Sequence, residues 1–98
     1  MPIDITVRHI TLNDSVQVQA REMAAKLVET YPAIEYVHIV FDGEANQYSV
    51  SMTAQGGQAT NVEAGAKGSD AIGALRELFA TADAKLRRAA QKRQEVRK

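Results

Sequence analysis

Apolar and polar positions alternate in the first ten residues of the chain. Ile3, Ile5 and Val7 fall on one side of this segment, and polar side chains fall on the other. A period of two residues is typical of a β-strand that buries one face. Three later segments alternate in the same way, and their apolar or small faces comprise Val37, Ile39 and Phe41, then Tyr48, Val50, Met52 and Ala54, and finally Thr60, Val62, Ala64 and Ala66. The opposite positions are mostly small or polar, so the pattern predicts a sheet with one face open to solvent.

Glycine-containing steps between these segments predict where the chain turns. Asp42-Gly43 favours a tight turn after the second strand, and Gly56-Gly57 favours another after the third. The last three strands are therefore expected to follow one another as hairpins.

Two further segments carry apolar residues at the 3.6-residue spacing of a helix. The first helix is predicted to begin at Asn13, a good N-cap residue, and to end at Tyr31, because Pro32 disfavours helical geometry in the residue before it. The second is predicted to begin after Ser69 or Asp70, either of which can cap it. Its apolar seam comprises Ile72, Leu75, Phe79, Ala82, Leu86 and Ala90.

The order of these elements is strand, helix, three strands and helix, which predicts an α+β domain of βαβββα type. Two amphipathic helices can bury their apolar stripes only by packing against one face of a four-stranded sheet. This architecture is similar to that of a double-stranded-RNA-binding domain. No internal repeat or low-complexity linker divides the chain, so residues 1–98 are predicted to form a single domain.

The apolar seam of the second helix changes character after Ala90. At helical spacing the next positions on that face are Arg93 and Arg97, which would not pack against a core. A helix from residue 69 to the end of the chain would be about 45 Å long, whereas a globule of this size has a radius of gyration of about 13 Å. The helix end, at about 91–98, is therefore predicted to project from the domain or to fray.

Charge is divided unevenly along a chain whose formal net charge is zero. Residues 1–84 hold five basic and eleven acidic residues, a balance of −6, whereas residues 85–98 hold seven basic residues and one acidic residue, a balance of +6. A local field of this kind attracts a polyanion. Lys85, Arg88 and Lys92 form a stripe beside the apolar seam. Cations complement the helix dipole only over the last turn, so the pattern alone leaves two explanations open: a solvated face and a nucleic-acid contact surface.

The composition excludes several kinds of site. The chain has no cysteine, which excludes disulfides, thiolate nucleophiles and cysteine-based zinc sites and makes a cytoplasmic location the default expectation. It has no HExxH motif, no Ser/His/Asp grouping and no phosphate-binding glycine loop. No apolar run is long enough to cross a bilayer, and the first ten residues lack the order of a secretory signal. We therefore expect a protein that is not an enzyme and that uses no metal, cofactor, membrane or small-molecule substrate.

Four stretches of the sequence, in their order and spacing, are similar to one known family. They are IDITVRHITLNDSV at the start, AAKL in the first helix, VHIVFD in the second strand and AGAKGSDAIGAL at the turn into the last helix. Together with the βαβββα order, they resemble the short form of the ribosome hibernation promoting factors, also called the ribosome-associated inhibitor or sigma-54 modulation family. The resemblance spans nearly the whole chain.

This resemblance implies a role on the ribosome. Members of the family bind the small ribosomal subunit in the channel of messenger and transfer RNA, and they silence translation in stationary phase or stress. Basic residues on their helices contact phosphates of ribosomal RNA. Carried onto this chain, the family pattern matches Lys26 in AKL and Lys67 before the last helix, and it places Arg88 in or next to the late-helix basic positions. The neighbours that extend this patch are Lys85, Arg87, Lys92 and Arg93.

The chain also departs from the family pattern. Relatives carry Lys or Arg in the middle of the last helix where this chain has Thr81 and Ala84, and an aromatic near the helix start is replaced by Ile72. The basic footprint is thus shifted toward the C-terminus. The alternative function is a protein-interaction or regulatory module on the same fold, with an acidic body that does not bind the ribosome.

Overall fold

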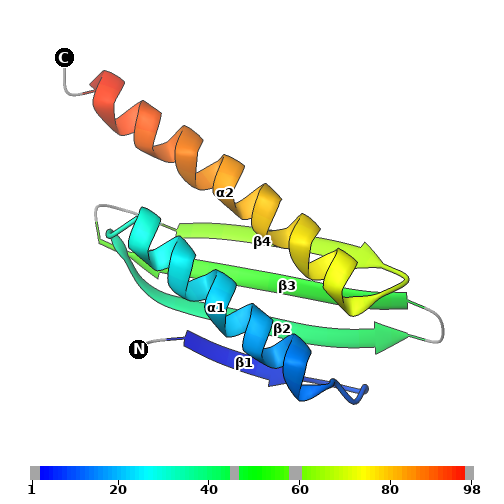
Figure 1. Cartoon of the computed structure of the whole chain (residues 1–98). Coiled ribbons are helices and arrows are strands. Elements are labelled where there is room, and N and C mark those ends of the chain that lie inside the picture. Colours follow the sequence, from blue (N-terminus) through cyan, green and yellow to red (C-terminus); the bar gives the residue numbers. More distant parts are fainter. Residues whose placement is uncertain (1–2, 45–46, 58–60, 97–98) are drawn as a thin grey trace.

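The computed structural model describes the backbone of residues 3–44, 47–57 and 61–96. Its elements are β1 (Ile3–Val7), α1 (Asp14–Thr30), β2 (Ile34–Glu44), β3 (Gln47–Gly56), β4 (Asn61–Gly68) and α2 (Ala71–Val96). Figure 1 shows these elements in chain order. The predicted α+β class and the βαβββα order are confirmed.

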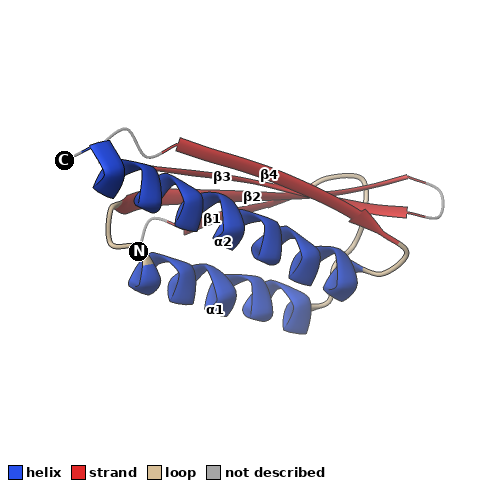
Figure 2. Ribbon diagram, turned by 90° about the horizontal axis from the view of Figure 1, so that it is seen from above, coloured by secondary structure: helices blue, strands red, loops and turns tan. Residues whose placement is uncertain are grey.

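The four strands form one mixed sheet in the order β1-β2-β3-β4. β1 and β2 are parallel, and the remaining neighbours are antiparallel. A parallel pair needs a crossover connection, which α1 supplies, whereas hairpins suffice for the antiparallel pairs. Figure 2 shows both helices on the same side of the sheet. The opposite side is open, as the alternation of apolar and polar positions predicts.

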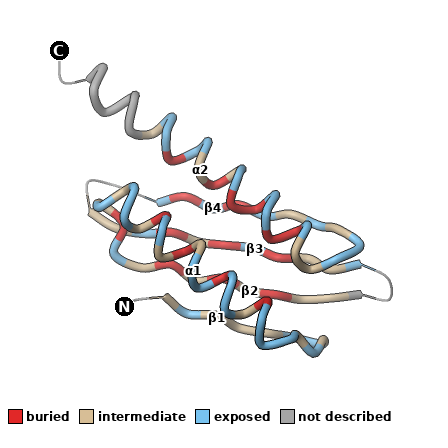
Figure 3. Tube along the Cα trace, in the orientation of Figure 1, coloured by how far each residue is buried: buried red, intermediate tan, exposed pale blue. Residues whose placement is uncertain are grey.

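The core lies between the helices and the inner face of the sheet, where the buried positions gather (Figure 3). The largest fully buried side chains are Phe41, Ile39, Met52, Leu75, Leu78, Val37 and Val50. They come from β2, β3 and α2, which meet at the centre of the domain. Of the predicted helical seam, Leu75, Phe79, Ala82 and Leu86 are buried. Thr60 and the side chain of Ala90 lie outside the described residues.

The helices begin and end close to the residues that the sequence predicts, and the structure shows which residue caps α2. The Asp70 carboxylate accepts the N–H groups of Ile72 (2.8 Å) and Gly73 (3.1 Å), so Asp70 rather than Ser69 caps α2. Asn13 occupies the N-cap position of α1, but its side chain makes no capping hydrogen bond. Tyr31 is the C-cap of α1, as the following proline predicts.

The predicted turn at Asp42-Gly43 is wrong. Both residues lie in β2, where Gly43 pairs with Tyr48, and the chain reverses between Glu44 and Gln47. Gly43 is required for close packing, because a Cβ atom there would overlap Cγ2 of Ile10. A glycine that makes room for a distant side chain looks the same in the sequence as a glycine that makes a turn.

The predicted turn at Gly56-Gly57 is correct only for its second residue. Gly56 still belongs to β3 and pairs with Ile34, whereas Gly57 lies beyond the strand. The N–H of Gly57 donates to the carbonyl oxygen of Ala33 (3.0 Å), which ties this turn to the start of β2. Residues 58–60 lie outside the described part of the chain.

The last helix extends beyond the strand on which it packs. Figure 1 shows α2 continuing past the N-terminal end of β4, and the molecule measures 50 × 24 × 16 Å along its principal axes. The side chains of 90–98 lie outside the described residues, so projection or fraying of about 91–98 stays a prediction, as does the single-domain organisation. In the part of the chain that the structure describes, no helix is both long and apolar enough to cross a membrane.

Candidate nucleic-acid interface

The two helices cover different halves of the sheet, which gives α2 two distinct flanks. α1 packs on β1 and β2, whereas α2 packs on β3 and β4. One flank of α2 therefore faces α1, and the other faces the free edge of β4 (Figure 1). We call these the α1 flank and the β4 flank. The predicted basic residues of α2 are divided between them.

Lys85 and Arg88 lie on the β4 flank. Both are exposed, and with Asn61, Glu63 and Ala89 they line a shallow groove between α2 and the edge of β4. Leu86, which lies between them in the sequence, is buried. Because successive residues of a helix point in different directions, Lys85 and Arg88 lie on its side and not on its core-facing stripe. The predicted basic stripe is therefore a real feature of this surface as far as Arg88. The side chain of Lys92, the third member of the stripe, lies outside the described residues.

Lys85 is fixed at the sheet edge by a hydrogen bond. Its ammonium group donates to the carbonyl oxygen of Glu63 (2.7 Å), a backbone group on the outermost strand. A lysine at this position discourages pairing of a further strand with the edge. Because a carbonyl is neutral, Lys85 keeps its positive charge while its position is restrained. The guanidinium of Arg88 makes no ion pair with the described side chains.

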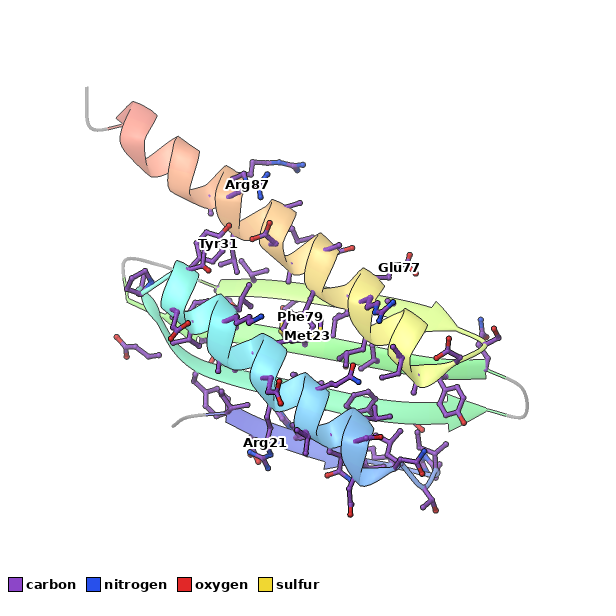
Figure 4. All side chains as sticks on the ribbon, in the orientation of Figure 1. Arg21, Met23, Tyr31, Glu77, Phe79 and Arg87 are labelled. Atoms are coloured by element: carbon purple, nitrogen blue, oxygen red, sulfur yellow. The ribbon has the colours of Figure 1, made fainter. Side chains whose placement is uncertain are left out.

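Arg87 lies on the α1 flank and has an acidic partner. Its Nη2 atom donates to Oδ2 of Asp83 (2.7 Å), one helical turn earlier. The other carboxylate oxygen, Oδ1, accepts the hydroxyl of Tyr31 (2.8 Å) from the end of α1. Figure 4 shows Tyr31 between the end of α1 and α2, with Arg87 further along α2. The charge of Arg87 is thus matched within the molecule.

Lys26 and Lys67 are separated from the β4 flank. Lys26 is exposed on α1, which lies on the other side of α2. Lys67 is exposed on β4 next to the inward-facing Ala66, so alternation places it on the open face of the sheet, opposite both helices. The side chain of Arg93 lies outside the described residues. Of the predicted residues whose side chains the structure describes, it brings together only Lys85 and Arg88.

The open face carries a cluster that sequence reasoning missed. Asp42, Ser49 and Lys67 pair across β2, β3 and β4 in one row. Nδ1 of His9 lies 2.9 Å from Oδ1 of Asp42, and this bond, followed by that from the Gly43 N–H, lowers the pKa of Asp42. His9 has a positive φ of 60° and lies just after the end of β1 at Val7. The alternation within each strand places Asp42, Ser49 and Lys67 on the open face. Only the register between the strands, which the sequence does not reveal, places them side by side.

The whole chain can be compared with known proteins. A model of the family described as sigma 54 modulation protein / S30EA ribosomal protein matches residues 3–94. The chain belongs to this family. The resemblance predicted from the sequence motifs is thereby confirmed. No curated protein matches the chain.

Two solved structures share the fold of this member of the S30EA family. A ribosomal subunit interface protein from Coxiella burnetii superposes with a TM-score of 0.84 at 14% identity, covering 93% of this chain and 99% of the other. The N-terminal domain of Protein Y from Thermus thermophilus gives a TM-score of 0.77 at 14% identity, covering 90% and 98%. At this identity the likeness establishes the fold alone.

The family to which this chain belongs consists of ribosome-associated factors and is not known as a family of enzymes. Among the described residues, no three His, Asp or Glu side chains are arranged to hold a metal ion. Among the described basic residues, Lys85 contacts a backbone carbonyl oxygen and Arg87 contacts a carboxylate. The exposed cations of α2, Lys85 and Arg88, can bind anions.

The Tyr31–Asp83 contact gives a measurable pH dependence. Burial, followed by the hydrogen bond to Asp83, raises the pKa of Tyr31 above its ordinary value. Since the folded pKa is the higher one, this contribution to stability is present below pH of about 10 and is lost as the pH rises through the folded value. Asp83→Ala is expected to lower the titration midpoint of Tyr31, measured by tyrosinate absorbance against matched Tyr31→Phe variants.

Tyr36 is the internal control for this titration. Burial and then Asp4 raise the pKa of Tyr36, so Asp83→Ala should leave its midpoint unchanged. An unchanged midpoint for Tyr31 would show that the contact with Asp83 does not form in solution.

Proposed function

We propose that this protein binds the small ribosomal subunit through basic residues of α2 that contact phosphates of ribosomal RNA, and that it thereby blocks translation under stress or in stationary phase. The observation that carries the proposal is the family match over residues 3–94. The name of one similar structure, a ribosomal subunit interface protein, supports a place on the ribosome. Such a partner implies a cytoplasmic location.

The charge distribution supports RNA as the ligand. Residues 85–98 carry a balance of +6, and the described cations of this segment, Lys85, Arg87 and Arg88, are exposed on α2. If about five of these cations neutralise phosphates, affinity falls by about two orders of magnitude between 50 and 200 mM salt. Binding of this kind is strong on a large polyanion and is readily reversed.

The proposed inhibition is steric. Phosphate contacts and the shape of the RNA would orient the protein, since backbone contacts fix position without reading the base sequence. None of the aromatic residues lies within residues 85–98, so stacking on unpaired bases does not contribute there. A protein seated where messenger and transfer RNA bind would block translation by occupancy, and no catalytic group is required.

Sedimentation tests this proposal directly. Stationary-phase lysate of cells that contain the protein is fractionated on sucrose gradients at low and at raised salt. The protein is expected to migrate with small subunits or whole ribosomes at low salt and to dissociate at raised salt. Migration as free protein at every salt concentration would contradict the proposal and favour the alternative, a protein-interaction or regulatory module.

A further inference from the structure

The three described cations near the end of α2 have different partners. Lys85 donates to a neutral carbonyl on β4, and Arg88 makes no ion pair with the described side chains. Arg87 alone is held by a carboxylate, Asp83. Lys85 and Arg88 on the β4 flank are therefore not paired with a described carboxylate and can contact an anion, whereas Arg87 on the α1 flank is already paired.

The pair of Asp83 and Arg87 is anchored from outside its own helix. An exposed pair of this spacing on a helix contributes little by itself, because water screens the charges and both side chains move freely. Here the hydroxyl of Tyr31 donates to Oδ1 of Asp83 (2.8 Å) and also lies 3.3 Å from the Asp83 carbonyl oxygen. Tyr31 is itself fixed as the C-cap of α1, where its N–H donates to Leu27. One carboxylate oxygen thus binds α1, and the other binds Arg87.

A phosphate that approaches Arg87 meets this carboxylate. Asp83 is half-exposed, and its carboxylate repels an anion and competes with it for the same guanidinium. We propose that Asp83 competes with RNA phosphates for Arg87, so that RNA contacts α2 along its β4 flank and not along its α1 flank. Asp83 is then a positioning residue that selects one face of the helix for the ligand.

The inference rests on the proposed function and predicts a definite change in affinity. Releasing Arg87 would add one phosphate contact, which steepens the dependence of log K on log salt by about 0.7–0.9. At 0.1 M salt, one such contact corresponds to a gain in affinity of about three- to tenfold. The gain must vanish when Arg87 is also replaced, because the proposal attributes it to that side chain.

A double-mutant cycle on the full chain separates this effect from a general change of charge. Binding of a short fluorescein-labelled RNA hairpin is measured by anisotropy over a salt series for wild type, Asp83→Asn, Arg87→Gln and the double variant. Asp83→Asn should bind about three- to tenfold more tightly with a steeper salt slope. Arg87→Gln alone should change affinity less than about twofold, and the double variant should lose the gain. Arg88→Gln is the matched control and should weaken binding about three- to tenfold.

The outcomes distinguish the two proposals. If Arg87→Gln weakens binding as much as Arg88→Gln, or if the gain in Asp83→Asn survives the loss of Arg87, the inference is overturned while the proposed function stands. If the wild type binds neither the hairpin nor small subunits, the proposed function fails and the inference fails with it. Circular dichroism checks that each variant is folded.

Discussion

Reversing the charge of Lys85 and Arg88 together is expected to weaken binding to the small ribosomal subunit by about a hundredfold. Each substitution removes one phosphate contact and places a carboxylate beside the RNA backbone, and each tenfold loss corresponds to about 1.4 kcal/mol. The two residues are exposed and line one groove along β4, so they would meet the same stretch of RNA. Co-sedimentation of Lys85→Glu/Arg88→Glu with purified small subunits over a salt series measures the loss, and the salt slope should fall by about 1.4–1.8.

A second double variant controls for net charge. Arg21→Glu/Arg76→Glu changes the charge by the same amount at exposed positions on α1 and early in α2, away from the β4 flank. This variant should retain most of the affinity. Both variants should melt near the wild-type temperature, because the β4 flank is tied together there by a single described hydrogen bond, from Lys85 to the Glu63 carbonyl. Equal weakening in the two variants would indicate a diffuse field rather than a site, and a large drop in melting temperature would show that the stripe is structural.

The periodic parts of the fold could be predicted because they depend on short-range patterns. Val37, Ile39 and Phe41 recur at every second position and are all completely buried in β2. The turn predicted at Asp42-Gly43 is wrong because this glycine depends on a long-range contact. Gly43 is required by the side chain of Ile10, 33 positions earlier, and no local pattern reveals so distant a contact.

The candidate site could be predicted only as far as helical spacing determines it. The positions of Lys85 and Arg88 beside the buried seam follow from their distance to Leu86. Lys67 was included among the RNA-binding residues because of the family resemblance, whereas alternation in β4 places it on the open face of the sheet. Asp83 was missed because its partner Tyr31 is 52 residues away, and the contact exists only once α1 and α2 pack together.

Replacing Gly56 with alanine is expected to destabilise the fold by about 3 kcal/mol or more, which is in the range of severe backbone and core defects. A Cβ atom at this position would overlap the carbonyl oxygen of Ala33 and lie 2.8 Å from both the Ala33 carbonyl carbon and Cα of Ile34. These are backbone atoms and cannot rotate away. β2 and β3 would have to separate where Ile34, which is only 4% exposed, enters the core. Urea denaturation measures the loss, which corresponds to a fall in melting temperature of about 12–24 °C for a domain of this size.

Gly65 provides a matched control for the same substitution in the same sheet. A Cβ atom there would meet only the carbonyl oxygen of Val50 at 3.8 Å, an ordinary contact on the open face. Glycine within a strand is less favourable than alanine by roughly 0.5–1 kcal/mol, so Gly65→Ala should leave stability unchanged or raise it slightly. The difference between the two variants isolates the close approach of β3 to the start of β2 from any general effect of removing glycine. If Gly56→Ala unfolds at the same urea concentration as Gly65→Ala, the two backbones do not approach as closely as the structure shows.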